Sequence, residues 1–275
     1  MTNGAYERHA KGIRILPGQW RPHYPFEQIA WISPPWPSQD YIWLDFPEAI
    51  FTDAGLLYLS HVNPDFPVVF PDLPKVSWQK YNNGLSFIRQ LPNGVKFGGS
   101  LVPNSEVTVA LELFIENGSD EPLTGLRLQT CAYLRGIKEF ADFTATNKFV
   151  HLANAGWINF EQAQLSTETG KYRLGFRGEG PAVADLPVFV TVSNGSQQLV
   201  AMTWYDSSAS IMSNPKHPCM HVDPVFPDLM IPGQRHSIEG ELIFFKGTLE
   251  QFEMWFKQRL ESAETFAGDL EGAQL

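Results

Sequence analysis

Glycine and proline residues are spread along the whole of this chain, and their even distribution constrains the fold more than any other feature of the sequence. The 275 residues include 22 Gly and 21 Pro, and the runs between them are short and rich in Val, Ile, Phe, Tyr and Trp. Short β-forming runs that alternate with turn residues are typical of antiparallel β architectures. We therefore expect an all-β fold, built as an antiparallel β-sandwich.

The same distribution indicates a single domain. No internal repeat is visible, and no low-complexity linker divides the chain. A hydrophobic content of 43% and a charged content of 18% are typical of a globular protein. We predict that residues 1–275 form one β-sandwich domain.

The net charge of −10, from 30 acidic and 20 basic residues, argues against a nucleic-acid partner. An acidic surface repels phosphate backbones, and no cluster of Lys and Arg offsets this repulsion. No apolar run approaches the roughly 20 residues that span a bilayer, and the first residues lack the apolar core of a signal peptide. We therefore expect a cytoplasmic protein without a membrane partner, in which Cys131 and Cys219 are free thiols.

The segment from Leu123 to Arg135 predicts a strand with two different faces. Alternate residues suit a core: Leu126, Leu128, Thr130, Ala132 and Leu134. The residues between them are polar or aromatic and include a thiol: Arg127, Gln129, Cys131, Tyr133 and Arg135. Such a face suits either the lining of a cleft or the solvated side of an ordinary sheet.

Other strands are expected wherever β-forming residues lie between turn formers. These are Tyr41–Asp45, Leu56–Ser60, Leu85–Gln90, Val107–Ile115, Tyr172–Phe176, Val188–Ser193, Leu199–Tyr205 and Ile238–Phe245. Thr248 and Gln251 have the spacing of a capping box, which predicts a helix over about 248–263 with a frayed tail after it. The apolar residues of this helix recur at helical spacing and should pack on the sandwich.

Two segments resemble one protein family. Cys219–Gln234 reads CMHVDPVFPDLMIPGQ and resembles the C-terminal part of the aldose 1-epimerases, or galactose mutarotases, which often run Cys-Leu-Glu-x-Gln, a Pro-Asp loop and Leu-x-Pro-Gly-Glu. Upstream, Ile115–Leu134 resembles the Asn-rich turn of that family and the following strand, which ends in Asn-His-x-Tyr-Phe. The resemblance implies a galactose mutarotase-like β-supersandwich, a superfamily that includes sugar epimerases and domains of polysaccharide lyases. It also implies a small carbohydrate ligand.

Two positions depart from the family pattern. Mutarotases carry a His on the upstream strand as general acid and a Glu in the C-terminal motif as general base. Alignment of the motifs places Cys131 at the His and His221 at the Glu. Imidazole accepts protons near neutral pH, whereas a thiol, with an ordinary pKa of about 8.5, is a poor acid for a ring oxygen. We therefore expect a divergent member that has a sugar cleft but altered chemistry.

The stretch His217–Pro224 holds the densest group of ionisable side chains. We assign His221 as a catalytic base with Asp223 orienting it, and His61, at the end of a predicted strand, as a second acid/base group. Alternatively, His217, His221 and Asp223 hold a divalent metal, because imidazole and carboxylate suit Zn, Mn or Fe. In a third interpretation these histidines are structural.

Five residues are candidates for holding the substrate. Gln129, Tyr133 and Arg135 suit sugar hydroxyls or a carboxylate, which Arg binds in a bidentate manner. Cys131 lies on the same predicted face. Trp204 offers an aromatic ring that stacks on a sugar, although it equally suits a core position.

We therefore hypothesise an enzyme that performs proton-transfer chemistry, of the epimerase, isomerase or lyase type, on a sugar or sugar acid. One alternative is a carbohydrate-binding protein without catalysis, and another is a metal-dependent enzyme that uses His61 with the His217, His221 and Asp223 set. The sequence contains no nucleotide-binding loop, zinc-protease motif or nucleophile elbow, so it requires no cofactor beyond a possible divalent metal. It carries no indication of an oligomeric state.

Overall fold

The computed structural model describes most of the chain. The described residues are 12–21, 23–38, 40–141, 146–153, 155–160, 162, 172–176, 183–195, 197–205, 208–213 and 217–272, of which 172–176, 183, 208–213 and 262–272 are described in their main chain only.

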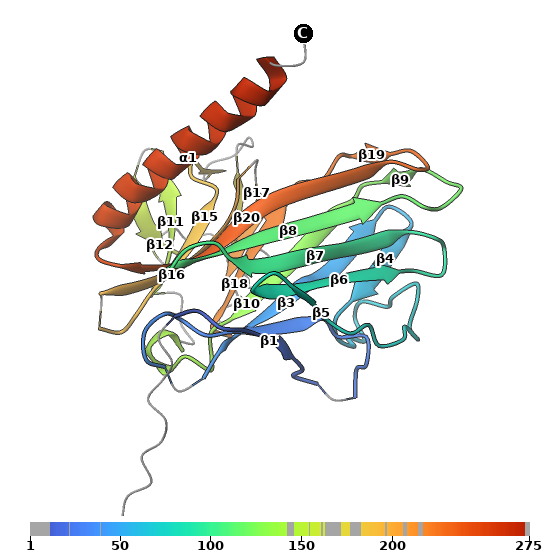
Figure 1. Ribbon diagram of the computed structural model, residues 1–275, viewed down its shortest axis with the longest axis horizontal. Helices are drawn as coiled ribbons and strands as arrows, with labels where there is room; N and C mark the ends of the chain where they lie inside the picture. Colours follow the sequence, from blue (N-terminus) through green and yellow to red (C-terminus); the bar gives the residue numbers. More distant parts are fainter. Residues whose placement is uncertain are drawn as a thin grey trace, which may run out of the picture.

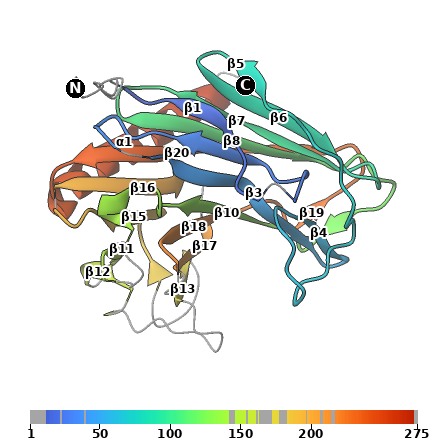
Figure 2. The same cartoon turned by 90° about the horizontal axis from the view of Figure 1, so that it is seen from below.

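The strands form two facing layers that meet at β11 (Figures 1 and 2). The first layer runs in the order β5 (Gln79–Tyr81), β6 (Gly84–Gln90), β7 (Lys96–Pro103), β8 (Thr108–Glu116), β20 (Arg235–Lys246), β16 (Gln198–Trp204), β15 (Val188–Val192), β11 (Lys148–Leu152) and β12 (Gly156–Asn159). These neighbours are all antiparallel. Consecutive hairpins account for most of this order. Two strands from later in the chain, β16 and β20, pair with each other and join the sheet beside them.

The second layer carries the candidate site. Its order is β1 (Ile15–Gly18), β2 (Ile29–Ile32), β3 (Ile42–Thr52), β10 (Arg127–Tyr133), β18 (Cys219–Pro224), β17 (Ser208–Ser213), β13 (Tyr172–Phe176) and β14 (Val183–Ala184), which also pairs with β11. The strand β4 (Gly55–Leu59) pairs with the end of β3, and β9 (Leu123–Thr124) pairs with β19 (Leu229–Met230) as a separate ribbon. A 3-10 turn, η1 (Lys138–Phe140), follows β10.

The hydrophobic core lies between the layers. Leu113 of β8 and Leu242 of β20 contribute from the first layer, and Leu128 of β10 contributes from the second. The alternation predicted for β10 is confirmed, because its apolar set is buried: Leu126, Leu128, Thr130, Ala132 and Leu134. Burying each large apolar side chain stabilises the fold by about 1.5–3 kcal/mol, which holds the two layers together and turns the other face of β10 outward.

The fold class agrees with the prediction of an all-β sandwich. The expected strands are present with two differences. The segment Leu123–Arg135 divides into β9 and β10, and β3 runs on to Thr52 where only Tyr41–Asp45 was expected. Four further strands in the first part of the chain were not predicted, because their runs are short and interrupted by turn residues. These are β1, β2, β5 and β7. Among the described residues, no helix is both long and apolar enough to cross a membrane.

The single described α-helix, α1 (Leu249–Gly272), begins where the capping box predicts. The Thr248 main-chain N–H donates to Gln251 Oε1 at 3.0 Å, and the Gln251 N–H donates to Thr248 Oγ1 at 3.3 Å. The predicted end near residue 263 is wrong, because the helix continues to Gly272. Residues 261–267 contain Glu and Ala and no Gly or Pro, so nothing in that stretch interrupts the helix.

Candidate functional site

Strand register gathers the site on the outer face of β3, β10 and β18. Tyr133 of β10 lies opposite Trp43 of β3 on one side and Cys219 of β18 on the other. In the next row, Cys131 lies opposite Asp45. Directly opposed residues of antiparallel strands project from the same face. Two rows of side chains therefore cross three strands that are far apart in the sequence.

The strand β18 alternates strictly between core and site. Met220 and Val222 point into the core, and Cys219, His221 and Asp223 occupy the other face, all of them buried. These three residues therefore share one face of the strand. His217 precedes the strand and is exposed, with its ring 6.4 Å from that of Tyr133.

A carboxylate that the sequence analysis did not single out joins the predicted residues. Glu48 Oε2 lies 3.3 Å from His221 Nε2 and accepts a hydrogen bond of 2.8 Å from Gln129 Nε2. Its other oxygen, Oε1, lies 4.0 Å from His61 Nδ1. Glu48 thus connects the two histidines predicted to be catalytic with the predicted substrate residue Gln129.

A bulge in β3 aims Glu48 at the cluster. The partner of Cys131 is Asp45 but that of Gln129 is Ala49, so β3 carries extra residues between these two pairs. Bulges redirect side chains at functional sites, and a proline inside a strand often marks one. Pro47, which immediately precedes Glu48, was the sequence signal that could have identified this residue.

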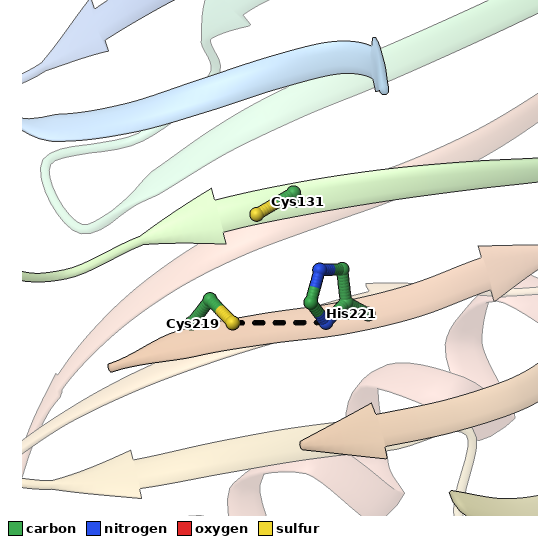
Figure 3. Close-up of side chains that lie close together, drawn as sticks. All are labelled: Cys131, Cys219 and His221. Carbon is green, nitrogen blue, oxygen red and sulfur yellow. Dashed lines mark hydrogen bonds between the residues drawn. The ribbon is translucent and has the colours of Figure 1, made fainter. Parts of the chain in front are cut away.

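The two cysteines lie beside His221 (Figure 3). Cys219 Sγ is 3.9 Å from His221 Nδ1 along the same strand, and Cys131 projects from neighbouring β10. One ligand atom from each of Cys131, Cys219 and His221 lies within 4.8 Å of the other two. Asp45, Glu48 and Cys131 form a second group of the same spacing.

The contacts shift the pKa values of the two thiols in opposite directions. A hydrogen bond from the Cys131 thiol, and then the positive charge of His221, hold the pKa of Cys219 well below its ordinary value despite burial. The same hydrogen bond, reinforced by burial, raises the pKa of Cys131. The arrangement favours a thiolate at Cys219 and a neutral thiol at Cys131.

Charge pairing determines the direction of the pKa shifts of His221 and Glu48, and burial determines that of Asp45. Burial opposes a charged imidazole, but the neighbouring Cys219 and Glu48 raise the pKa of His221 well above its ordinary value. Burial also opposes a charged Glu48, yet the hydrogen bond and charge of His221, with the charge of His61, lower its pKa to about 2. Burial raises the pKa of Asp45 to about 7, against the attraction of Arg21.

The segment between β1 and β2 covers one end of this face. Trp20 stacks on Tyr133 with ring centroids 5.0 Å apart and contacts Trp43 at 5.4 Å. Arg21 Nη2 donates to Asp45 Oδ2 at 3.0 Å, and the guanidinium of Arg21 also pairs with the buried Glu27. These contacts leave the cysteines and His221 almost without solvent exposure.

One residue of the cluster, His61, borders a cavity. A cavity of about 270 Å³ lies between the end of β4 and the proline-rich loop 62–73. His61 belongs to its lining together with Asn63 and the aromatic rings of Phe26, Phe66 and Phe70. The His61 side chain is 25% exposed, compared with 6% for His221. Of the two histidines beside Glu48, His61 is therefore the one that a ligand in the cavity would meet.

Two predicted substrate residues lie away from the cluster. Trp204 is 1% exposed in the core, where its ring stacks on Phe46 and its indole N–H donates to the Val222 carbonyl at 2.8 Å. Arg135 lies beyond the end of β10 and is exposed. Core packing thus occupies the Trp204 ring, and the end of the strand carries Arg135 past the rows of the site.

The metal set expected from the sequence also differs from what the fold assembles. Among the described residues, the groups with suitable spacing contain His221 together with Cys131 and Cys219, but neither His217 nor Asp223. His217 stands outside the strand, and Asp223 lies further along β18. Sulfur ligands from two strands, rather than neighbours in one stretch of sequence, surround His221.

No family model and no curated protein matches the sequence. Among solved structures, an aldose epimerase homologue from C. elegans is 11% identical, with a TM-score of 0.47 over 87% of this chain and 100% of that chain. A galactose mutarotase-like protein from Clostridium acetobutylicum is 9% identical, with a TM-score of 0.42 over 86% of this chain and 99% of that chain. These similarities concern the family that the sequence motifs predicted, and they assign no role to any residue.

Proposed function

We propose that this protein is a carbohydrate-active enzyme that transfers protons on a sugar or sugar acid, in a reaction of the isomerase, epimerase or lyase type. The observation that carries the proposal is the position of Glu48, which contacts both His61 and His221 beside a cavity that His61 lines. The two segments that resemble galactose mutarotases supply the carbohydrate part of the proposal.

The geometry favours His61 as the group that exchanges the proton. A general base needs a ring nitrogen within hydrogen-bond reach of the substrate. In His221, Nδ1 faces Cys219 and Nε2 faces Glu48. His61 borders the cavity, and Glu48 and the Ser60 hydroxyl, 3.3 Å from Nδ1, hold its ring in place.

The cavity lining suits one sugar ring. Phe26, Phe66 and Phe70 offer apolar faces, and Asn63 and His61 offer polar groups. Sugar sites combine such faces with a few polar groups that set orientation. Gln129, bound to Glu48, supports the site from behind. In this proposal Asp223, Cys131 and Tyr133 shape the buried side of the cluster.

Thermal stability and NMR together test the proposal. A panel of aldoses, uronic acids and oligosaccharides should contain a ligand that stabilises the protein, by about 2.7 kcal/mol at 100 times its dissociation constant. NMR of that ligand should show epimerisation or elimination. His61→Gln should lower the turnover rate by roughly 10²–10⁴-fold, which is the usual contribution of a general acid or base.

His217→Gln is the matched control, because His217 is an exposed histidine of the same region that lies outside the cluster. It should leave turnover unchanged. Equal losses in both variants, or full activity in His61→Gln, would remove His61 from the mechanism. A flat response across the whole panel would contradict the carbohydrate proposal itself.

A second candidate function, sugar binding without turnover, has one observation in its favour. Cys131 and His221, which stand where mutarotases carry their acid and base, are 7% and 4% exposed. Groups so well covered suit a structural role. In that case a sugar would stabilise the protein, and His61→Gln would change the affinity for the sugar. Neither the wild type nor the variant would convert the sugar.

A further inference from the structure

The geometry points to a divalent metal site formed by Cys131 Sγ, Cys219 Sγ and His221 Nδ1, with zinc as the ion that it fits. This inference goes beyond the proposed function and does not depend on it. The three residues come from β10 and β18, and their donor atoms converge on the outer face of the sheet (Figure 3).

The spacing of the donors agrees with tetrahedral coordination. Zinc binds thiolate sulfur at about 2.3 Å and imidazole nitrogen at about 2.0–2.1 Å, so two ligands of one ion lie roughly 3.6–3.8 Å apart. The separation of Cys219 Sγ and His221 Nδ1 is 3.9 Å. All three donor atoms lie within 4.8 Å of one another, so small side-chain rotations would complete the site.

The donor types select the ion. Two sulfurs and one imidazole suit zinc and cobalt(II), and they do not suit magnesium or calcium, which prefer oxygen. Three protein ligands of this kind leave a fourth position for water or a carboxylate. Asp45 and Glu48 each place an oxygen within 4.8 Å of Cys131 Sγ, so a carboxylate is at hand for that position.

The surroundings of His221 are those of a metal ligand. Histidines that bind metals usually donate their second ring N–H to a carboxylate, which fixes the tautomer. His221 Nε2 lies 3.3 Å from Glu48 Oε2, which leaves Nδ1 directed at the sulfur of Cys219. Gln129 in turn holds Glu48 by a hydrogen bond of 2.8 Å. The second shell is therefore in place around the proposed ligands.

The acidic side chains beside the cysteines also suit a bound cation. Asp45 and Glu48 lie beside Cys131, and Arg21 pairs with Asp45 and with the buried Glu27. A bound dication would displace two protons, one from the Cys131 thiol and one from His221 Nδ1, and would offset the charge of the two thiolates. Burial of both cysteines, 7% and 3% exposed, would protect these ligands from oxidants and competing solvent.

Cobalt(II) provides the direct test. The full-length protein, reduced and freed of metal by a chelator, is titrated with cobalt(II), and the thiolate-to-cobalt absorption band is recorded. One equivalent should produce the band, and zinc should displace cobalt and abolish it. In the wild-type protein, zinc should also slow alkylation of both cysteines. The absence of a thiolate band, or alkylation rates that zinc does not change, would overturn the proposal.

Substitutions then identify the ligands. Cys131→Ser and Cys219→Ser should each abolish the band, and Glu48→Gln, which retains all three ligands, should weaken metal binding by roughly 10–100-fold. The controls His217→Gln and Asp223→Asn should bind as tightly as the wild type. Binding that survives either cysteine substitution, or that is lost in His217→Gln, would contradict this ligand set. Circular dichroism identifies variants that fail to fold. If the cysteine variants do not fold, protection of the wild-type cysteines from alkylation by zinc tests the proposal instead.

Discussion

Two buried histidines stand between acidic partners in different parts of this molecule. His221 of β18 lies between Glu48 and Cys219, and His151 of β11 lies between Asp185, at 2.6 Å, and Glu253 of α1, at 3.3 Å. Their side chains are almost equally buried, at 6% and 7% exposed. Residue type and burial therefore do not distinguish the two positions.

The partners of His151 and His221 differ in their exposure to water. Asp185 and Glu253 are 34% and 24% exposed, so water can solvate both carboxylates, and His151 packs against the Trp157 ring at 5.2 Å. Glu48 is 14% exposed and shares its contacts with a second histidine, a glutamine and the cysteine pair. We interpret the first arrangement as a link between helix and sheet and the second as a functional site, because only the second concentrates charge away from water.

The largest expected effect is at Glu48. Glu48→Leu should lower the free energy of unfolding by about 3–5 kcal/mol, since it leaves the buried His221 without its carboxylate. Chemical denaturation in the presence of a chelator measures this loss. The double variant Glu48→Leu/His221→Leu should recover most of it, because an apolar pair replaces a broken ionic one. If Glu48→Leu alone is as stable as the wild type, the Glu48–His221 pair does not stabilise this face of the sheet.

The docking of α1 should depend on packing rather than on the ion pair between Glu253 and His151. Phe252 is 0% exposed and packs with the apolar residues of β15 and β16. Phe252→Ala should therefore cost about 3 kcal/mol of unfolding free energy, as expected for truncating a buried aromatic ring. The control Met254→Ala, at a side chain 62% exposed, should change stability by less than about 0.5 kcal/mol. Equal effects would mean that α1 is not docked through this face.

The smallest effect is expected at Glu253, the partly exposed partner that α1 contributes to His151. Glu253→Gln should cost about 0.2–1 kcal/mol, and less at high salt, because water screens exposed ion pairs. Denaturation at two salt concentrations measures the difference. Asp185 still contacts Nδ1 in this variant. A loss as large as that of Glu48→Leu would show that the two histidine positions are energetically alike.

Local patterns in the chain were sufficient for much of the fold. The alternation of Leu123–Arg135 placed the core face of β10 correctly, and the Thr248–Gln251 pair located the start of α1. Cys219, His221 and Asp223 share one face of β18, since a strand repeats every two residues. These features depend on neighbours in sequence, so a period or a short motif reveals them.

The site itself depends on long-range pairing. The bond between Gln129 and Glu48 joins residues 81 positions apart, and it forms because β3 lies beside β10 with a bulge at Pro47. No local period encodes which distant strands become neighbours, or where a bulge turns a side chain. The pairing of β10 with β18 likewise brought Cys131 close to Cys219, and the packing of the two layers put Trp204 in the core.

Alternation along single strands could therefore be predicted from the sequence alone, because main-chain geometry imposes it wherever a strand forms. The convergence of Glu48, the two cysteines and two histidines was settled by the order of strands in the sheet and by the segment that covers them. Strand order is a property of the whole chain, because it minimises exposed apolar surface over both layers at once.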